Sequence, residues 1–472
     1  MLVTVTDFLW SYVLVSVLIV MGLVFTVGSR FVQLRYFGEM FRVLGQAFHH
    51  HPGQVSSFQA LTLSVAGRVG AGNIAGVAVA ITLGGPGAIF WMWVVGLIGM
   101  ATSFFECSLA QAYKTRDNRT GTFRGGPMYY IERGLGSRAL GLVFTVLLLV
   151  TFGLAFVALQ SFTASSSLEE AFGIPTRTTG IVLTIVVGLT IFGGVQRISR
   201  VTEVVVPVMA VLYIAVALVV IIANIGQVPA VLALIVNSAF GLDPAIGGGI
   251  GAAIMHGVRR GLFSNEAGLG SAPNVAAVAY VPHPVNQGIV QSFSVFIDTA
   301  IICTATAFII LMAGMHTVGD IDNGVVLTQL ALAEHVGAWG QPFVSFVLML
   351  FAFSSILYNF YLGENATHWI DPGNRLLFVI FRVLMLVLVF WGSTQNLATI
   401  FSFADLTMAL LAVVNLIALG LMVKVCFRLM RDYDEQARAG QVPQFDPERF
   451  ADLAIDHDAW SDAPGAGPAK QR

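Results

Sequence analysis

The chain has 472 residues, of which 11% are charged and 56% are hydrophobic, and its formal net charge is −2. A soluble chain carries roughly 25% charged residues, because its surface cannot be covered by apolar side chains alone. The near-neutral balance provides no basic surface for nucleic acid, and the three cysteines include no CxxC pair that would indicate a disulfide framework or a zinc site. The composition therefore argues against a soluble enzyme, a secreted domain and a nucleic-acid-binding protein, and it predicts a polytopic membrane protein.

Apolar stretches long enough to cross a membrane recur along the whole chain. A bilayer core of roughly 30 Å needs about 20 apolar residues in a helix. A shorter amphipathic stretch, residues 325–336, is expected to be a surface helix. The sequence predicts an all-helical protein with eleven transmembrane helices, over residues 8–27, 58–83, 87–110, 140–159, 177–194, 204–222, 245–280, 290–312, 344–362, 376–391 and 406–423.

The lysines and arginines indicate the orientation of these helices, because cytoplasmic loops concentrate them. With the N-terminus outside, nineteen of the 24 basic residues fall in inner loops or the C-terminal tail, and one, Arg177, falls in an outer loop. The other four, Arg68, Arg259, Arg260 and Arg382, lie within predicted helices. The sequence thus predicts a multi-pass membrane protein with its N-terminus outside and a polar, partly disordered C-terminal tail in the cytoplasm.

Two of the predicted helices contain an interruption. Residues 58–83 include four glycines within ten positions, and each glycine in a helix costs about 1 kcal/mol relative to alanine. Residues 245–280 are too long for one straight span, since a helix of this length would measure about 54 Å. The interrupted helices are five spans apart, so each opens a block of five and the second block is inverted relative to the first. Paired interruptions of this kind indicate the binding site of a secondary transporter.

Four motifs lie in these interrupted helices and in the segments around them. They are residues 64–77 (SVAGRVGAGNIAGV), 84–93 (GGPGAIFWMW), 125–130 (GGPMYY) and 260–273 (RGLFSNEAGLGSAP). In this order and spacing they resemble the alanine-or-glycine:cation symporter family, also known as the sodium:alanine symporter family. The resemblance implies a LeuT-type fold of two inverted five-helix repeats with one additional N-terminal helix. The corresponding segments are 1–57 (additional helix and cytoplasmic loop), 58–223 (first repeat), 224–427 (second repeat) and 428–472 (polar cytoplasmic tail).

The resemblance also implies which residues bind the solutes. Asn73 is the expected side-chain ligand of one sodium ion. The expected ligands of a second are the carbonyls of Ala66 and Val69 and the hydroxyls of Ser354 and Ser355. The alternatives are structural: an amide contact between helices for Asn73, hydroxyl bonds within their own helix for the serines, and core packing for Phe156. The expected substrate-binding residues are Gly70, Ala71, Gly72, Asn73, Phe156, Ser264, Asn265 and Asn359.

The chain departs from the family pattern in two places. Family members carry Gly-Trp where this chain has Tyr358–Asn359, and that Trp lines the amino-acid pocket. We therefore expect a pocket that is larger or more polar and that suits a different amino acid or an amine. The second departure is Arg68, which lies in the first interruption. A fixed cation there can pair with Glu266 or Asp298, bind the substrate carboxylate, or replace one coupling ion.

Charged residues within the membrane are functional by default. For Glu266 with Arg259 or Arg260, the two interpretations are a gate and a salt bridge that holds the second interruption. For Asp298 they are an ion site and a structural pair with Arg68. Glu106, near the inner end of its helix, is expected to be structural. The expected gating or charge network consists of Arg68, Arg260, Glu266 and Asp298.

These observations predict a secondary active transporter that carries a small neutral amino acid together with Na⁺ by alternating access. The open alternative is a proton-coupled or ion-independent transporter of a different amino acid or amine on the same fold. A membrane enzyme is not expected, because the chain lacks clustered nucleophiles, bases or metal ligands, and interrupted helices in inverted repeats argue against a channel. We expect Na⁺ as the coupling ion, no cofactor, and a monomer whose partners are the amino acid, the cation and the lipid bilayer.

Overall fold

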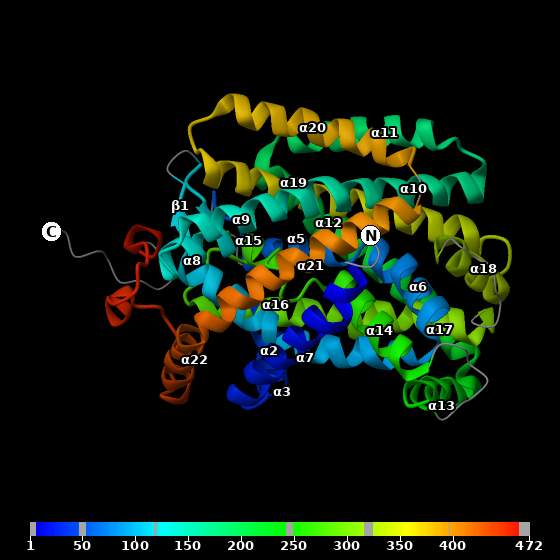
Figure 1. The fold of residues 1–472 in the computed structure, drawn as a ribbon, viewed down its shortest axis with the longest axis horizontal. Helices are drawn as coiled ribbons and strands as arrows, with labels where there is room; N and C mark the ends of the chain where they lie inside the picture. Colours follow the sequence, from blue (N-terminus) through cyan, green and yellow to red (C-terminus); the bar gives the residue numbers. More distant parts are fainter. Residues whose placement is uncertain are drawn as a thin grey trace.

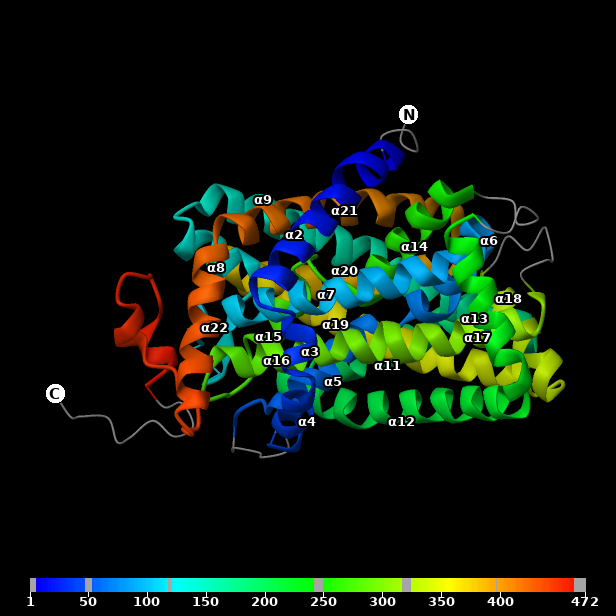
Figure 2. The ribbon, with the colours of Figure 1, turned by 90° about the horizontal axis from the view of Figure 1, so that it is seen from below.

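The computed structural model describes residues 6–46, 53–117, 120–241, 249–315, 324–395 and 397–461. Within these ranges the regular secondary structure is helical apart from one antiparallel hairpin, in which β1 (Thr115–Arg116) pairs with β2 (Phe123–Arg124). The long helices lie side by side in one bundle, and both views show this arrangement (Figures 1 and 2). Long apolar segments form helices in a membrane because a helix satisfies its own backbone polar groups where water is absent.

Among the described residues, eight helices are long and apolar enough to cross a membrane, and a ninth is counted if one bent pair forms a single span. The eight spans contain η1 (Leu9–Leu14) with α2 (Val15–Gly28), α7 (Gly87–Ala112), α9 (Arg138–Leu148) with η3 (Leu149–Phe156) and α10 (Val157–Phe172), α12 (Gly194–Ala223), α16 (Pro284–Val295) with η5 (Phe296–Cys303) and α17 (Thr304–Met312), α19 (Gly340–Ile370), α20 (Arg375–Ser393), and α21 (Leu397–Leu421).

The expected number of eleven spans is not confirmed by length and composition. Nine of the expected spans coincide with one of these helices or with the bent pair. The expected span at 177–194 is α11 (Thr176–Ile191), which has 16 residues. The expected span at 245–280 divides into α14 (Gly249–Asn265) and α15 (Ala272–Ala276), and neither part is long enough alone.

The bent pair contains the first expected interruption. Helix α5 (Ser57–Arg68) begins with a capping box, in which Ser56 Oγ accepts from the Gln59 amide and the Gln59 side chain accepts from the Ser56 amide. After α5 the chain continues as η2 (Gly72–Gly76) and α6 (Val77–Gly84), and the two parts meet at an angle of 49°. The gap between α14 and α15 is the second expected interruption.

The interrupted helices lie among the long spans rather than at the edge of the bundle. Helix α7 packs against α16 and α14, and α5 packs against α12 and α19. Helix α10 packs against α19 and α20. The outer edge in Figure 1 consists of α11 and α20, which contact each other and α10. This arrangement places both interruptions where the surrounding helices can supply polar side chains.

Short helices connect the spans. One of them differs from its expectation: α18 was expected as a surface helix, but Val325, Leu327 and Leu332 are buried, and it packs on α17, α19 and η2. The hydrophobic residues of α18 are spread around the helix rather than along one side, and a helix of this kind is buried by apolar neighbours on most sides. The connecting helices are α3 (Val32–Arg35), α4 (Phe37–Gln46), α8 (Pro127–Gly134), η4 (Ile225–Gln227), α13 (Val228–Ala239) and α18 (Gly324–Val336).

The C-terminal segment is folded as far as residue 461. It contains α22 (Val423–Arg438) and the single turns η7 (Pro447–Phe450) and η8 (His457–Ala459). Phe445, Phe450 and Trp460 are buried together, and the Trp460 ring lies 3.8 Å from Lys114 Nζ. The expectation of partial disorder therefore does not hold for the described part of the tail, because its aromatic residues, diluted among charges in the sequence, form a small core.

Candidate functional site

The first interruption lies between α5 and η2, and its residues are buried. Val69 follows α5 with extended backbone angles (φ −83°, ψ 91°). A Cβ atom on Gly70 would lie 2.7 Å from Ser355 Oγ, and one on Gly72 would lie 3.0 Å from the Phe263 ring. Both positions therefore need glycine for the neighbouring side chains to approach the backbone.

Side chains bind the backbone amides of this gap in place of the carbonyls of α5. Asn73 Oδ1 accepts from the Gly70 amide (2.9 Å), and Gln160 Oε1 of α10 accepts from the Ala71 amide (3.1 Å). In an uninterrupted helix the Gly70 amide would bind the Ala66 carbonyl. The Ala66 carbonyl is thus released from the helix, and uncharged carbonyl oxygens of this kind suit a monovalent cation that must also leave.

The two serines expected to bind sodium differ in what they contact. Ser355 Oγ donates to the Ala66 carbonyl (2.8 Å), which joins α19 to the end of α5. Ser354 Oγ donates to the Phe351 carbonyl of its own helix (3.0 Å) and lies 3.6 Å from Met209 Sδ of α12. The structure therefore brings Ser355, but not Ser354, to the released carbonyl.

A buried carboxylate, Asp298 of η5, lies beside the first interruption. Its Oδ1 accepts from Asn73 Nδ2 (2.5 Å), and both of its oxygens accept from Ser264 Oγ at the end of α14 (2.9 and 3.0 Å). Thr299 Oγ1 also donates to Oδ2 (2.8 Å). Carboxylate, hydroxyl and amide groups from three segments meet here, and such oxygen-rich clusters are the environments that hard cations prefer.

Arg68 is buried, at 1% exposure, and forms no ion pair with any residue of the described ranges. Its Nη1 donates to the Gln291 carbonyl (2.9 Å) and to Ser294 Oγ, both on α16, and its Nη2 donates to Ser103 Oγ of α7 (2.9 Å). The hypothesis that Arg68 pairs directly with Glu266 or Asp298 is therefore wrong for this conformation, because neutral oxygens of α7 and α16 already bind the guanidinium.

Three buried acidic side chains interact electrostatically with Arg68 at longer range: Glu106, Glu266 and Asp298. One fixed positive charge therefore faces three groups that can each carry a negative charge. In a membrane interior such an excess is costly unless cations or protons compensate for it. The composition of this cluster thus favours the binding of positive species near the interruptions.

The second interruption covers residues 266–271. Glu266, Gly268 and Gly270 have positive φ angles there (55°, 88° and 78°). Glu106 Oε1 accepts from the Gly268 amide (3.2 Å), and Asn415 Nδ2 donates to the Gly268 carbonyl (2.9 Å) and to Glu106 Oε2 (3.0 Å). Glu106 thus has a structural position, as expected, because it binds the unwound backbone.

Other side chains complete the support of the second interruption. Glu266 Oε2 accepts from Ser271 Oγ (2.6 Å) and from the Tyr358 hydroxyl (3.0 Å). Asn265 Oδ1 accepts from the Ala267 amide (3.0 Å), and its Nδ2 donates to Thr299 Oγ1 (3.3 Å). Asn265 was expected to bind substrate, whereas in this conformation both ends of its amide are bound within the protein.

Arg259 and Arg260 have partners other than the expected Glu266. Arg260 Nη2 lies 2.6 Å from Asp405 Oδ2 of α21, and Arg259 Nη1 lies 3.8 Å from the same oxygen. Arg259 Nη2 also lies 2.9 Å from Asp7 Oδ1. The pairing of Glu266 with either arginine is therefore not formed, and α14 is tied to α21 instead.

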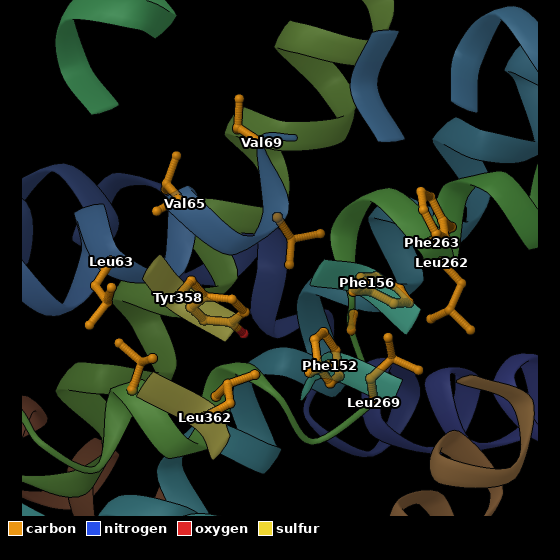
Figure 3. Close-up of a cluster of buried hydrophobic side chains, with 14 of the residues drawn as sticks. Leu63, Val65, Val69, Phe152, Phe156, Leu262, Phe263, Leu269, Tyr358 and Leu362 are labelled. Carbon is orange, nitrogen blue, oxygen red and sulfur yellow. The ribbon is translucent and has the colours of Figure 1, made fainter. Parts of the chain in front are cut away.

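Aromatic rings pack beside these ion pairs. The Phe263 ring centroid lies 5.0 Å from that of Phe156 and 5.8 Å from that of Phe401, and the Arg260 guanidinium lies 5.0 Å from the Phe401 ring. Figure 3 shows Phe156 and Phe263 in the same buried cluster as Tyr358 and Val69. The Phe156 ring therefore packs against the second interrupted helix, as expected for core packing, and its lining of a substrate pocket stays a prediction.

The Tyr358–Asn359 pair occupies the part of α19 next to both interruptions. The Tyr358 ring lies against Gly67, and its hydroxyl reaches Glu266 as described above. Asn359 is buried one helical turn after Ser355, on the same face of α19. Its Nδ2 has no hydrogen-bond partner among the described residues, and a buried donor without an acceptor is a candidate for binding a solute.

Sequence reasoning missed several residues of this region, among them Gln160, Thr299 and Asp405. Each is a polar residue in an apolar span, which is the only signal that could have indicated it. Of the predicted residues, the structure brings together Ala66, Val69, Gly70, Ala71, Gly72, Asn73, Ser264, Asp298 and Ser355, whereas Arg260 lies with Asp405 and Asn265 supports the second interruption.

Comparison of the fold with solved structures identifies transporters. The structure of MhsT in complex with L-phenylalanine matches with a TM-score of 0.58 and 14% sequence identity, over 78% of this chain and 89% of that chain. A mutant of the Eremococcus coleocola manganese transporter matches with a TM-score of 0.52 and 15% identity, over 84% and 83% of the two chains. At these identities the similarity concerns the fold, which is the expected LeuT-type fold.

Sequence comparison covers almost the whole chain. The "Probable sodium/glutamine symporter GlnT" of Bacillus subtilis is 48% identical over 93% of this chain and 91% of its own length. The "Amino-acid carrier protein AlsT" of the same organism is 46% identical over 97% and 96%. The "Sodium/alanine symporter AgcS" of Methanococcus maripaludis is 36% identical over 92% and 96%.

The family assignment rests on the sequence profile as well as on these relatives. The profile of the sodium:alanine symporter family matches residues 1–447, from the first span to the folded part of the tail. This family consists of multi-pass membrane transporters and not of enzymes. With the helical fold, the two interruptions and the relatives in agreement, the chain belongs to the sodium:alanine symporter family.

Proposed function

We propose that this protein couples the uptake of a small neutral amino acid to Na⁺ across the bacterial cytoplasmic membrane. The observation that carries the proposal is the first interruption, where the released Ala66 carbonyl, the Ser355 hydroxyl and the Asp298 carboxylate cluster lie close to one another. Backbone carbonyls and a buried carboxylate bind a cation, and the amides of the same gap can bind a carboxylate. One short segment thus offers ligands for both solutes.

These contacts support a proposal of two cation sites. The first consists of Asp298 with Asn73, Ser264 and Thr299, which all touch the carboxylate. The second consists of the carbonyls of Ala66 and Val69 with the Ser355 hydroxyl. We assign Ser355 rather than Ser354 to this site, because the Ser354 hydroxyl is directed to its own helix.

The amino acid binds between the interruptions. Its carboxylate takes the place of Asn73 or Gln160 at the amides of Gly70 and Ala71, next to Gly72, since those side-chain acceptors can rotate away whereas the backbone cannot. Phe156 covers the site from η3. We infer a polar substrate side chain such as that of glutamine, because Asn359 Nδ2 lacks an acceptor and a carbonyl oxygen would supply one. The name of the GlnT relative, a probable sodium/glutamine symporter, supports this choice.

The specificity proposal has a direct test. Asn359→Ala is expected to lower glutamine uptake by about tenfold, the effect of one lost hydrogen bond in a buried site, and to leave alanine uptake little changed. Uptake of both labelled amino acids by proteoliposomes measures this difference. Alanine uptake that exceeds glutamine uptake in the unmodified protein would overturn the choice of a polar side chain.

The transport cycle proposed is alternating access on eleven helices. In it, segments 58–223 and 224–427 are inverted repeats, 1–57 is the additional helix with its loop, and the N-terminus is outside. The Arg260–Asp405 pair and the rings of Phe156 and Phe263 close the outer end of the site. The protomer has a complete set of ligands by itself, so we propose that a monomer is the transporting unit.

A second candidate is a proton-coupled or ion-independent carrier on the same fold. It is favoured by Arg68, a fixed buried cation among the acidic groups Glu106, Glu266 and Asp298, because such a charge can take the place of one coupling ion. If it does so, Arg68→Ala should create an additional requirement for Na⁺, seen as a steeper dependence of uptake on Na⁺ concentration.

The deciding experiment is uptake by proteoliposomes under separate Na⁺ and pH gradients. We expect accumulation of the labelled amino acid with an inward Na⁺ gradient and none with a pH gradient alone. Uptake that follows the pH gradient would favour the proton-coupled alternative, and exchange that ignores both gradients would favour the ion-independent one. A thermal-shift screen of amino acids with and without Na⁺ identifies the substrate first, since a ligand that binds the folded state raises its stability.

A further inference from the structure

A polar cavity lies away from the interruptions, where α19 ends and α20 begins. It has a volume of about 350 Å³ and is bounded also by the β1–β2 hairpin and by the link between α11 and α12. This volume is within the range of small-ligand sites. Its charged lining is balanced, with three basic and three acidic side chains: Arg124, Arg375, Arg382, Asp117, Glu364 and Asp371.

Arg382 is a basic group of this cavity whose acidic neighbour, Glu364, acts on it only at longer range. Among the described residues, its guanidinium forms no ion pair or hydrogen bond, and its Nε is buried without an acceptor. Three aromatic rings hold it, those of Phe378 (4.0 Å), Phe192 (5.4 Å) and Phe360 (5.9 Å). The rings orient the guanidinium and cover its Nε, whereas the side chain as a whole stays partly exposed, so its Nη groups can donate to an anionic ligand in the cavity.

Glu364 is the matching acidic group. It is 7% exposed, its Oε1 lies 3.5 Å from Arg124 Nη2, and its Oε2 is buried without a hydrogen-bond partner in the described part of the chain. Arg124 is shared with Asp117 (2.7 Å), so it compensates for Glu364 only in part. Glu364 and Arg382 form no ion pair with each other, although both line the cavity. The site therefore offers one unmet acceptor and one unmet cation to a single ligand.

The surface next to the cavity indicates where the ligand comes from. Helices α11 and α20 form the outer edge of the bundle (Figure 1), and α20 exposes Val379, Ile380 and Val383 by more than half. Phe192, at the cavity itself, is 64% exposed. Apolar residues exposed to this extent on a membrane-spanning helix face lipid chains. The cavity thus opens beside the acyl chains, at the end of α20 that carries Arg375.

We propose that this cavity binds the phosphoethanolamine headgroup of a membrane phospholipid. The phosphate accepts hydrogen bonds from Arg382 and Arg375, and the primary ammonium donates to Glu364 Oε2 and Asp371. Basic pockets between membrane helices bind the phosphate-containing headgroups of lipids. The balance of three positive and three negative side chains favours a headgroup that itself carries both charges over a purely anionic one.

The proposal predicts a preference between two lipids of equal charge. Phosphatidylethanolamine has an ammonium with three N–H donors, whereas phosphatidylcholine has the same phosphate and positive charge but no N–H donor. Native mass spectrometry of the full-length protein, with equal amounts of both lipids added, measures which one is retained. We expect the unmodified protein to retain phosphatidylethanolamine about tenfold more, the effect of one hydrogen bond to a charged acceptor.

Two variants separate the roles of the two groups. Glu364→Gln should remove the preference while both lipids still bind, and Arg382→Gln should weaken the retention of both by about tenfold. Arg200→Gln is the matched control, because Arg200 is an exposed arginine of α12 outside the cavity. Since Glu364 also contacts Arg124, the melting temperature of each variant is measured, and Asp371→Asn serves as a second test of the ammonium contact.

Several outcomes would overturn the assignment. Equal retention of the two lipids by the unmodified protein would exclude recognition of the ammonium. Unchanged retention in Arg382→Gln would exclude the phosphate contact. Displacement of the lipid by free glutamine or alanine would show that the cavity takes a soluble zwitterion and not a headgroup. None of these measurements requires transport activity, so the result is independent of the proposed function.

Discussion

The two interruptions differ in how their backbone is bound. The first is a gap of three residues, Val69 to Ala71, without positive φ angles. The second spans 266–271 and has positive φ at Glu266, Gly268 and Gly270. A longer gap leaves more backbone groups without helix partners, and in a membrane each of them needs another partner.

The partners differ in kind. In the second interruption, Glu106 and Asn415 bind both the amide and the carbonyl of Gly268, so the unwound backbone is satisfied by the protein itself. In the first, the partner of the Ala66 carbonyl within the described ranges is the Ser355 hydroxyl, which can equally well act as a ligand beside it. A gap whose polar groups are all bound internally is a support, and a gap whose carbonyls remain available is a binding site. This difference teaches that unwinding alone does not identify the ion site.

The largest effect is expected from Asp298→Asn, next to the first interruption. The substitution keeps the shape and removes the charge that Asn73, Ser264 and Thr299 surround. Because a contact with a charged group contributes about 2–3 kcal/mol, Na⁺-driven uptake should fall by about 100-fold. Initial rates in proteoliposomes measure the loss, with Glu170→Gln, an exposed acid at the end of α10, as the control.

Asp298→Asn can also test the location of the cation directly. If stabilisation by Na⁺ in a thermal-shift measurement is lost in this variant and kept in the control, the carboxylate belongs to the ion site. Normal Na⁺ stabilisation with low uptake would instead place Asp298 in a later step of the cycle and contradict the assignment.

A tenfold effect is expected from Ser355→Ala, and its neighbour provides the matched control. Ser355 reaches the Ala66 carbonyl, whereas Ser354 binds its own helix. Removal of one neutral ligand should raise the Na⁺ concentration for half-maximal uptake by about tenfold in Ser355→Ala. The same substitution at Ser354 should change it little. If Ser354→Ala has the larger effect, the second cation site has been assigned to the wrong serine.

At the second interruption we expect a loss of stability rather than of coupling. Glu106→Gln replaces an anionic acceptor of the Gly268 amide by a neutral one, and it places an amide nitrogen in a cluster of donors. The free energy of unfolding should fall by about 2 kcal/mol. Thermal unfolding in detergent measures this change, with the more exposed Glu132→Gln as control. An altered Na⁺ dependence of uptake in Glu106→Gln would make the second interruption a part of the ion site after all.

The sequence predicts the interruptions well because their signals are local. Glycines at close spacing and a polar stretch in an overlong apolar segment both reflect the cost of a helix at that point. The partners of the interruptions are not predictable in this way. Arg260 pairs with Asp405, which is 145 positions away, and only the packing of α14 on α21 brings them together. The same holds for Gln160, which meets the Ala71 amide through the packing of α10.

The number of spans and the folding of the tail also depend on tertiary packing, which local sequence patterns do not reveal. The length of an apolar segment indicates whether it can cross a bilayer, but α11 and α14 are shorter than the usual spanning length. How deeply such short helices lie in the membrane depends on the helices packed against them. In the tail, Phe445 and Trp460 lie among charged residues, so the composition indicates disorder. Their burial becomes evident only when α22 and the loop around Lys114 are placed together.

The smallest effect is expected from pH, and it acts on the loop that follows the second interruption. His283 is fully buried in that loop; its Nδ1 accepts from the Val285 amide (3.1 Å), and its Nε2 lies 3.1 Å from Asp432 Oδ2 of α22. Because Nδ1 is an acceptor, the ring is neutral, with its proton on Nε2. Burial lowers the pKa of His283 below its usual value, and this outweighs the opposite influence of Asp432.

The sign of the pH effect follows from this pKa. When the tail is undocked, His283 takes up a proton below about pH 6.5, its usual pKa. The buried ring of the docked state resists protonation. Docking of the tail therefore becomes less favourable as the pH falls below about 6.5. Hydrogen exchange of α22 should become up to about tenfold faster per pH unit after correction for intrinsic rates. The exposed His457, changed to Gln, is the control. Equal protection of the α22 amides above and below about pH 6.5 would mean that protonation of His283 does not weaken the docking of the tail.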